Sequence, residues 1–141
     1  MDECIFCRIA RGEARASVVA RSSRAMAFMD IAPVAAGHVL IIPTAHVADI
    51  YELSDEDAAA VMQMAVRVAR ALWAAFAPAG LNLISSNGRA AGQDVFHFHL
   101  HLVPRVPGDG IRFRWPHSDR PDRDELDALA REIRSHLEIA S

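Results

Sequence analysis

The sequence predicts one domain, residues 1–141, in which short β-strands and α-helices share a core. The length of 141 residues and the hydrophobic content of 52% match one ordinary domain with a substantial core. Short apolar runs bounded by proline, glycine and polar residues recur along the chain and are typical of strands. Between these runs, one long segment carries apolar residues at helical spacing, which predicts a helix that covers the strands.

The N-terminal elements are short. Cys4 to Ala10 predicts a helical turn that ends at Gly12. Val18 to Arg21 and Ala25 to Asp30 predict two strands, and the polar residues between them favour a hairpin. The continuous apolar run from His38 to Pro43 predicts a central strand, because a strand buried on both faces loses the alternation of apolar and polar residues.

The clearest helix follows Ser54, whose hydroxyl can cap the first turn, and three acidic residues come next at the positive end of the helix dipole. Pro78 and Gly80 end this segment. The residues at helical spacing that should cover the sheet are Val61, Ala65, Val68, Leu72 and Phe76. Three apolar residues lie off this stripe and indicate either a wider core face or a subunit interface: Met62, Met64 and Val66.

The second half of the chain continues with strands and a final helix. Leu81 to Ser85 predicts a strand, Asn87 to Gln93 a flexible turn, and Phe96 to Val103 a strand that Pro104 ends. Asp122 predicts the start of a C-terminal helix. The apolar residues of that helix are Leu126, Leu129, Ile133 and Leu137.

The Phe96 to Val103 run is the most informative part of the sequence, because His97, His99 and His101 alternate with apolar residues. In a strand, these three imidazoles share one face and stand roughly 6.6 to 6.8 Å apart. Each ring needs partners for its nitrogens, so packing alone does not explain three of them. The row predicts either a transition-metal site or a nucleophile with acidic or phosphate-binding neighbours. The side chains that should point into the core are Phe96, Phe98, Leu100 and Leu102.

Composition narrows the possible partners. The formal net charge of −3 and the pI near 6.1 predict no general attraction to nucleic acid or to anionic membranes, so phosphate recognition should be local. The chain contains no lysine and no glycine-rich P-loop, which excludes a lysine phosphate clamp.

The N-terminus is acidic and lacks the features of a secretory signal, and no apolar run approaches the length needed to span a bilayer, so we expect a cytoplasmic protein. In that compartment Cys4 and Cys7 should be reduced thiols or metal ligands rather than a structural disulfide.

Several motifs together resemble the histidine-triad family of nucleotide hydrolases and transferases, over nearly the whole chain. They are Cys4-Ile5-Phe6-Cys7, Phe28-Met29-Asp30-Ile31, Gly37 to Pro43, Asn87 with Gly92-Gln93, and His97-Phe98-His99-Leu100-His101-Leu102-Val103. The resemblance implies an α+β fold with an antiparallel sheet, a long central helix and a C-terminal helix packed on it. It also implies a homodimer.

The resemblance assigns roles to the histidines. It makes His99 the nucleophile that attacks the α-phosphorus of a nucleotide and forms a nucleotidyl-histidine intermediate, in agreement with the nucleophilicity of neutral imidazole. His101 should hydrogen-bond a phosphoryl oxygen or the leaving group. His38, on the central strand, should steady the cluster, and His97 completes the catalytic set.

The resemblance also assigns nucleotide-binding residues. Asp30 matches the ribose ligand, because a carboxylate can accept from both sugar hydroxyls. Asn87, Gln93 and backbone N–H groups near Gly92 should hold phosphate. The residues that match the apolar pocket for a purine base are Ile5, Phe6, Ile9, Phe28 and Ile31.

One residue departs from the family pattern. Asp94 follows the glycine-glutamine pair where many relatives carry serine or threonine. A carboxylate there could repel the phosphate or the leaving group, bind a cation, or act as an acid if protonated.

Four residues match the metal ligands of the bacterial branch of the family: Cys4, Cys7, His46 and His97. A set of two cysteines and two histidines suits tetrahedral zinc. We expect a structural zinc ion that ties the N-terminal segment to the start of the histidine strand and leaves His99 and His101 for chemistry. The alternative is an empty pair of reduced thiols.

The leading interpretation is an enzyme that cleaves nucleoside 5′-phosphate derivatives at the α-phosphorus, with phosphoramidates, adenylates and dinucleoside polyphosphates as candidate substrates. One alternative is a metallohydrolase that uses all three strand imidazoles, although residues at this spacing converge poorly on one ion. Another is a non-catalytic nucleotide-binding or scaffold protein.

Overall fold

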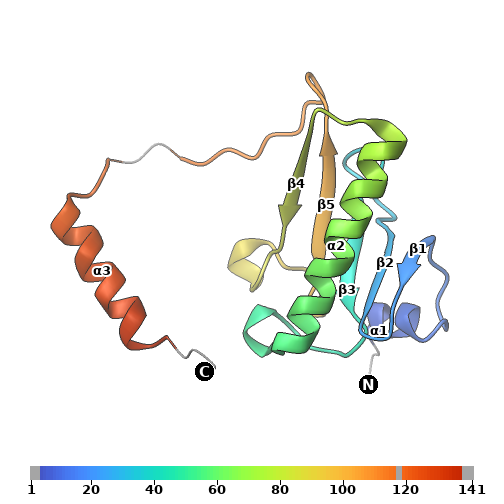
Figure 1. Cartoon of the computed structure of the whole chain (residues 1–141), viewed down its shortest axis with the longest axis horizontal. Coiled ribbons are helices and arrows are strands. Elements are labelled where there is room, and N and C mark those ends of the chain that lie inside the picture. Colours follow the sequence, from blue (N-terminus) through green and yellow to red (C-terminus); the bar gives the residue numbers. More distant parts are fainter. Residues whose placement is uncertain (1–3, 117–118, 138–141) are drawn as a thin grey trace. The chain divides into compact units, whose positions relative to one another are not determined.

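The computed structural model describes residues 4–116 and 119–137 (Figure 1). These residues belong to two compact units, 1–111 and 112–141. The first unit contains the sheet and every predicted site residue. That the whole chain is one domain stays a prediction.

A five-stranded antiparallel sheet forms the centre of the first unit, which confirms the α+β class. The strands are β1 (Val18–Arg21), β2 (Ala25–Met29), β3 (Val39–Pro43), β4 (Gly80–Ile84) and β5 (Leu100–Arg105), in the order β1-β2-β3-β5-β4. As predicted, the apolar β3 is the middle strand, and all of its residues are buried.

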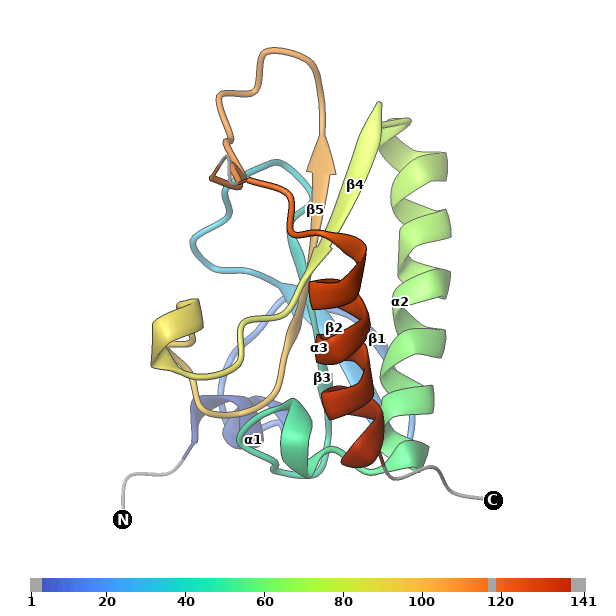
Figure 2. The same ribbon diagram turned by 90° about the vertical axis from the view of Figure 1, so that its left-hand side faces the viewer.

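Helix α2 (Asp55–Phe76) covers one face of this sheet (Figure 2). Ser54 caps it by accepting a hydrogen bond from the Asp57 N–H at 3.1 Å. The predicted stripe is buried except at its end, where Phe76 is 62% exposed. Phe76 was wrongly assigned to the core because a 22-residue helix, about 33 Å long, extends past strands of five residues.

The three apolar residues beside that stripe have different environments. Met64 is buried in the core against the sheet, so the wider core face is correct for this residue. Met62 and Val66 are 50% and 40% exposed. For these two the subunit interface stays a prediction.

Helix α2 also corrects the estimate that no apolar run is long enough to span a bilayer. By length and composition alone, residues 55–76 are long and apolar enough to cross a membrane, with a mean hydropathy of 1.2. The many alanines raise this value, and the helix packs Val61, Met64, Val68 and Leu72 on the sheet. It is therefore a core helix of this unit.

Helix α1 (Ile5–Ala10) lies on the opposite face of the sheet from α2 (Figure 2). Its Phe6 and Ile9 pack on Met26, Phe28, Leu40 and Ile42. Side chains alternate along a strand, so Leu100 and Leu102 of β5 face α2. The same alternation places His99 and His101 on the α1 face.

The histidine strand differs in extent from its prediction. β5 begins at Leu100, so His97 and His99 precede it, because its neighbour β3 pairs only with residues 100–102. Pro104 lies inside β5, at a position that β4 pairs but β3 does not reach. Phe96 is 38% exposed rather than buried, and the guanidinium of Arg89 stacks on its ring.

Two short 3₁₀ helices, η1 (Ile50–Glu52) and η2 (Arg89–Ala91), complete the first unit. The second unit contains α3 (Arg123–Ser135), which Asp122 caps by accepting from the Glu125 N–H at 2.9 Å. The predicted C-terminal helix is therefore confirmed. Its packing on the sheet stays a prediction.

Candidate active site and metal centre

A cavity of about 640 Å³ opens on the α1 face of the sheet. Its size is that of a small-molecule site, and its walls are mostly apolar. His99 and His101 both line it. The other lining residues that the sequence singled out are Ile5, Phe6, Ile9, Phe28, Asp30, Ile31 and Asp94. Lining residues without a sequence signal of their own are Arg15, Ala16, Ser17, Met29, Ala32, Leu40 and Val95.

One hydrogen bond fixes the tautomer of His99. Its Nδ1 lies 2.8 Å from the backbone oxygen of His97, and a carbonyl can only accept, so Nδ1 carries the proton. The lone pair is then on Nε2. Only 5% of His99 is exposed, and the edge of the Phe6 ring packs against it at a centroid distance of 5.2 Å. Because the ring also lines the cavity, Nε2 is its available nucleophilic atom.

The hydrogen bonds of His38 determine the tautomer of His101. The Val34 N–H donates to Nδ1 of His38 at 3.2 Å, so the proton of a neutral His38 is on Nε2. That nitrogen lies 2.9 Å from Nδ1 of His101. His38 therefore donates to His101, and His101 carries its own proton on Nε2. The backbone of residue 34 thus makes His101 a hydrogen-bond donor.

Burial keeps these two rings neutral. Burial, followed by the neighbouring His99 and His38, lowers the pKa of His101 to about 4, and the carboxylates of Asp30 and Asp94 offset only part of the effect. Burial also lowers the pKa of His38, against the opposing effect of Asp30. At neutral pH His101 is a neutral donor, not an imidazolium.

Asp30 lies at the cavity wall. Its Oδ1 accepts from the Ala32 N–H at 2.8 Å, and its Oδ2 lies 3.4 Å from Nε2 of His38. Asp30, His38 and His101 are close enough to hold a metal ion. However, the Val34 N–H donates to Nδ1 of His38, so Nε2 carries the proton and has no lone pair for a metal ion. This favours a chain of hydrogen bonds among the three residues over a metal site.

Three predicted phosphate-binding residues do not line the cavity: Asn87, Gly92 and Gln93. Asn87 accepts from the Ile50 N–H at 2.8 Å and donates to Ser85 at 3.1 Å. The buried Gln93 donates to the Ala48 carbonyl at 2.6 Å and accepts from the Gly88 N–H at 2.8 Å. Their side chains hold the protein's own loops together. Their role toward phosphate stays a prediction.

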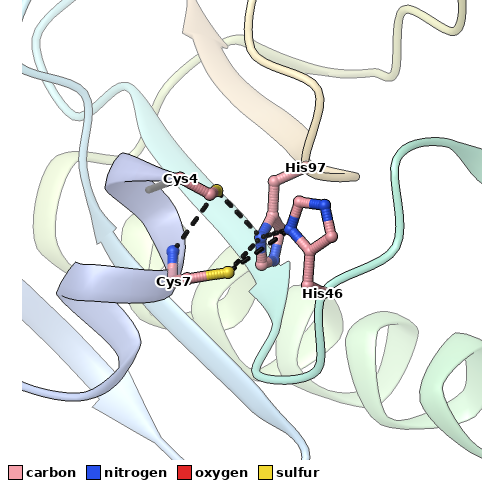
Figure 3. A group of neighbouring side chains, drawn as sticks. All are labelled: Cys4, Cys7, His46 and His97. Carbon is pink, nitrogen blue, oxygen red and sulfur yellow. Dashed lines mark hydrogen bonds between the residues drawn. The ribbon is translucent and has the colours of Figure 1, made fainter. Parts of the chain in front are cut away.

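The four predicted metal ligands come together at the N-terminus of α1 (Figure 3). Sγ of Cys4 lies 3.4 Å from Nδ1 of His97, and Sγ of Cys7 lies 3.3 Å from Nδ1 of His46. The two histidine Nδ1 atoms are 3.2 Å apart. The ligand atoms of all four residues lie within 4.8 Å of one another.

This donor set fits a tetrahedral metal ion. Zinc bonds of about 2.0 to 2.3 Å place neighbouring ligand atoms roughly 3.3 to 3.8 Å apart, close to the observed distances. The buried His97 presents Nδ1 because its Nε2 donates to the Pro43 carbonyl at 2.8 Å. Such a second hydrogen bond is typical of histidine ligands. The four residues could therefore hold a metal ion.

The side chain of His97 thus has other contacts than the side chains of His99 and His101. Its ring faces the two cysteines, while the other two rings line the cavity. The three imidazoles do not converge on one point, which argues against a metallohydrolase that uses all three. No sequence signal indicated the backbone groups that hold the rings, at residues 34, 43 and 97.

The fold and the cavity define a small-molecule site beside two histidines of fixed tautomer, with a separate cluster that could hold a metal ion. Comparisons with known proteins give the family. The HIT domain model matches residues 11–108, so the protein belongs to the HIT, or histidine-triad, family.

An adenosine 5′-monophosphoramidase of Schizosaccharomyces pombe is 37% identical over 95% of this chain and 98% of its own. A HIT family protein of Bacillus subtilis has a crystal structure that superposes with a TM-score of 0.92, at 36% identity, over 99% of this chain and all of that one. The crystal structure of a zinc-bound histidine-triad protein from Mycobacterium smegmatis superposes with a TM-score of 0.73, at 35% identity, over 95% and 97% of the two chains.

Proposed function

We propose that this protein hydrolyses nucleoside 5′-phosphate derivatives at the α-phosphorus through a nucleotidyl-histidine intermediate. The observation that carries this proposal is the pairing of an unprotonated Nε2 on His99 with an N–H donor on His101 in one cavity. A nucleophile needs the former, and a phosphoryl oxygen needs the latter. The S. pombe relative, an adenosine 5′-monophosphoramidase, supports adenosine derivatives.

The chemistry has two displacements. Nε2 of His99 forms a bond to phosphorus, the bond from phosphorus to the leaving group breaks, and the leaving atom keeps the electron pair and takes a proton from solvent. Water then attacks phosphorus, the N–P bond breaks with its pair returning to Nε2, and a proton is released. His101 donates to a phosphoryl oxygen in both steps, and such a bond to a charged group contributes roughly 1.5 to 3 kcal/mol.

The His97 carbonyl has a specific part in this scheme. Once Nε2 of His99 is bonded to phosphorus, the ring carries a positive charge, and its Nδ1–H bond to the carbonyl at 2.8 Å becomes charge-assisted. The same bond holds the ring in place for attack. His97 therefore acts through its backbone, and His38 acts by orienting His101.

The remaining cavity suits a nucleoside. Phe6 and Phe28 form an apolar wall with the isoleucines, and Asp30 offers an acceptor for ribose hydroxyls. We infer that a purine base lies on the apolar wall. Phosphoramidates, adenylates and dinucleoside polyphosphates are the candidate substrates.

We further propose that Cys4, Cys7, His46 and His97 hold zinc. The donor distances support this assignment, as does the zinc-bound M. smegmatis relative. A zinc ion bound there would cross-link α1 to the loop at His46 and to the histidine segment, so its role would be structural.

Two further proposals concern assembly and location. Met62 and Val66 leave an apolar strip exposed on α2, which supports a homodimer. We also propose a cytoplasmic location, because cysteines in a reducing compartment stay thiols or bind metal, the two roles expected for Cys4 and Cys7. We propose no nucleic-acid or membrane partner, in keeping with the net charge of −3.

Single-turnover labelling tests the proposed reaction. An adenosine phosphoramidate labelled at the α-phosphorus should leave an acid-labile label on the wild-type protein and none on His99→Asn, with turnover reduced more than about 10⁴-fold in the variant. His136→Asn, at the exposed end of α3, is the matched control. Binding without label or turnover would favour the non-catalytic alternative.

A further inference from the structure

Asp94 is the cavity residue that the proposed reaction does not use. It lines the same cavity as His99 and His101, and its side chain is exposed. Within residues 4–116 and 119–137, its carboxylate forms no hydrogen bond or ion pair. Unlike Asp30, which is anchored to the Ala32 N–H, Asp94 is available to a ligand.

The balance of charge in the cavity is unusual for a site that binds phosphate. Among the described residues that line it, Arg15 is the one arginine, against the two carboxylates of Asp30 and Asp94. The chain contains no lysine. With the ring of His101 neutral, a substrate that brings several phosphate charges meets little compensation here.

The position of Asp94 indicates which part of the substrate it meets. The apolar wall and Asp30 are suited to the nucleoside. Asp94 lies instead in the electrostatic neighbourhood of His101, the ring that donates to the transferred phosphoryl group. The group that extends beyond that phosphoryl is the leaving group.

We propose that Asp94 selects the leaving group by its charge, so that nucleoside 5′-phosphoramidates of cationic amines are cleaved in preference to derivatives with anionic leaving groups such as polyphosphates. This inference rests on the proposed reaction at His99. Asp94 is a specificity-determining residue, because its charge acts on the substrate and no proton or bond is transferred to it.

Coulomb's law gives the size of the effect. Two unit charges about 6 Å apart, in surroundings with a dielectric constant of about 40 to 80, interact strongly enough to change a rate roughly threefold to tenfold. Changing the leaving group from cation to anion doubles the difference in interaction energy, so the ratio of rates changes by roughly tenfold to 100-fold. The Debye length of about 10 Å at 0.1 M salt predicts that the preference shrinks as salt is added.

Three adenosine 5′-phosphoramidates of similar size test the proposal, with 2-aminoethyl, 2-hydroxyethyl and carboxymethyl groups on nitrogen. The ratio of kcat/KM for the cationic to the anionic substrate is measured for the wild type, Asp94→Asn and Asp94→Glu. Comparing proteins on the same substrates cancels the intrinsic reactivity of each leaving group. Glu56→Gln, which removes an exposed negative charge from the first turn of α2, is the matched control.

We expect the ratio to fall at least tenfold in Asp94→Asn, to be retained in Asp94→Glu and Glu56→Gln, and to fall in the wild type at 0.5 M salt. An unchanged ratio in Asp94→Asn, with the neutral substrate still cleaved through His99, would overturn the role of Asp94 alone. If the wild type cleaves none of the three substrates, the proposed reaction is overturned, and this inference with it.

Discussion

Acid should destabilise the fold through His101. The pKa of this histidine is lowered from its ordinary value of 6.5 to about 4, chiefly by burial. The unfolded chain therefore takes up a proton at this residue as the pH falls below about 6.5, while the folded protein does so only near pH 4. Because the unfolded state binds more protons in this window, the free energy of unfolding decreases as the pH falls through it. Above pH 7 His101 has no such effect.

The magnitude follows from the two pKa values of 6.5 and about 4. Each unit of difference is worth 1.36 kcal/mol, so His101 alone removes about 1.4 kcal/mol at pH 5.5 and about 3 kcal/mol at pH 4. The side chain is 25% exposed, and partial solvation lowers the expected loss at pH 4 to about 2 to 3 kcal/mol. This is a large fraction of the stability of an ordinary domain.

Urea unfolding of the wild type and His101→Asn between pH 4 and 8 measures this loss. Asparagine keeps an acceptor near the position of Nδ1, so His38 retains a partner, but it does not titrate. The other ionisable residues are the same in both proteins, so their contributions largely cancel in the difference between the two free energies of unfolding. That difference should shift in favour of the variant by about 2 to 3 kcal/mol from pH 7 to pH 4. A pH-independent difference, or a shift in favour of the wild type, would refute the argument.

Other predictions concern the metal cluster and one glycine. Cys4→Ser should lower the zinc content of the purified protein and its Tm by roughly 10 °C, because a metal at 100 times its Kd contributes about 2.7 kcal/mol; full zinc content and an unchanged Tm would exclude the structural role. Gly37→Ala should destabilise the protein by about 1 to 3 kcal/mol in urea unfolding, since Gly37 has φ +89° and an added Cβ would lie 3.2 Å from Pro104 and 3.3 Å from Leu72. Gly12→Ala, at φ +74° with nothing within 4 Å, should show the smaller conformational cost alone.

Much of the fold could be predicted from the sequence because its signals are local. The apolar run of β3 and the serine cap of α2 each determine their element through neighbouring residues. The errors came where distant packing decides. Phe76 repeats at helical spacing, yet it is the last residue of a helix longer than the strands that it covers, and its ring is exposed. Phe96 fits an inward-facing strand position, but no ladder extends to it, and it stacks with Arg89 instead.

The site was predictable in its residue types but not in its chemistry. Alternation predicted His97, His99 and His101 on one face; His99 and His101 line one cavity, but the His97 ring contacts the cysteines. Cys4 and Cys7 lie in one cluster. No sequence pattern shows which imidazole nitrogen carries the proton. That depends on backbone groups whose identity is the same for every residue, and only the folded chain brings them to the rings.

His97 links the two parts of the site through different atoms of one residue. Its side chain is held by the Pro43 carbonyl on Nε2 and faces the cysteines with Nδ1, so a metal ion bound there would restrain its backbone. The carbonyl of that same backbone holds Nδ1 of His99. Residue 97 precedes β5, and the peptide unit that carries its carbonyl is held outside the sheet, by the Phe98 N–H bond to the Val47 carbonyl at 2.8 Å. A metal ion bound to the His97 side chain would add a second restraint to this peptide unit, whose carbonyl orients the proposed nucleophile.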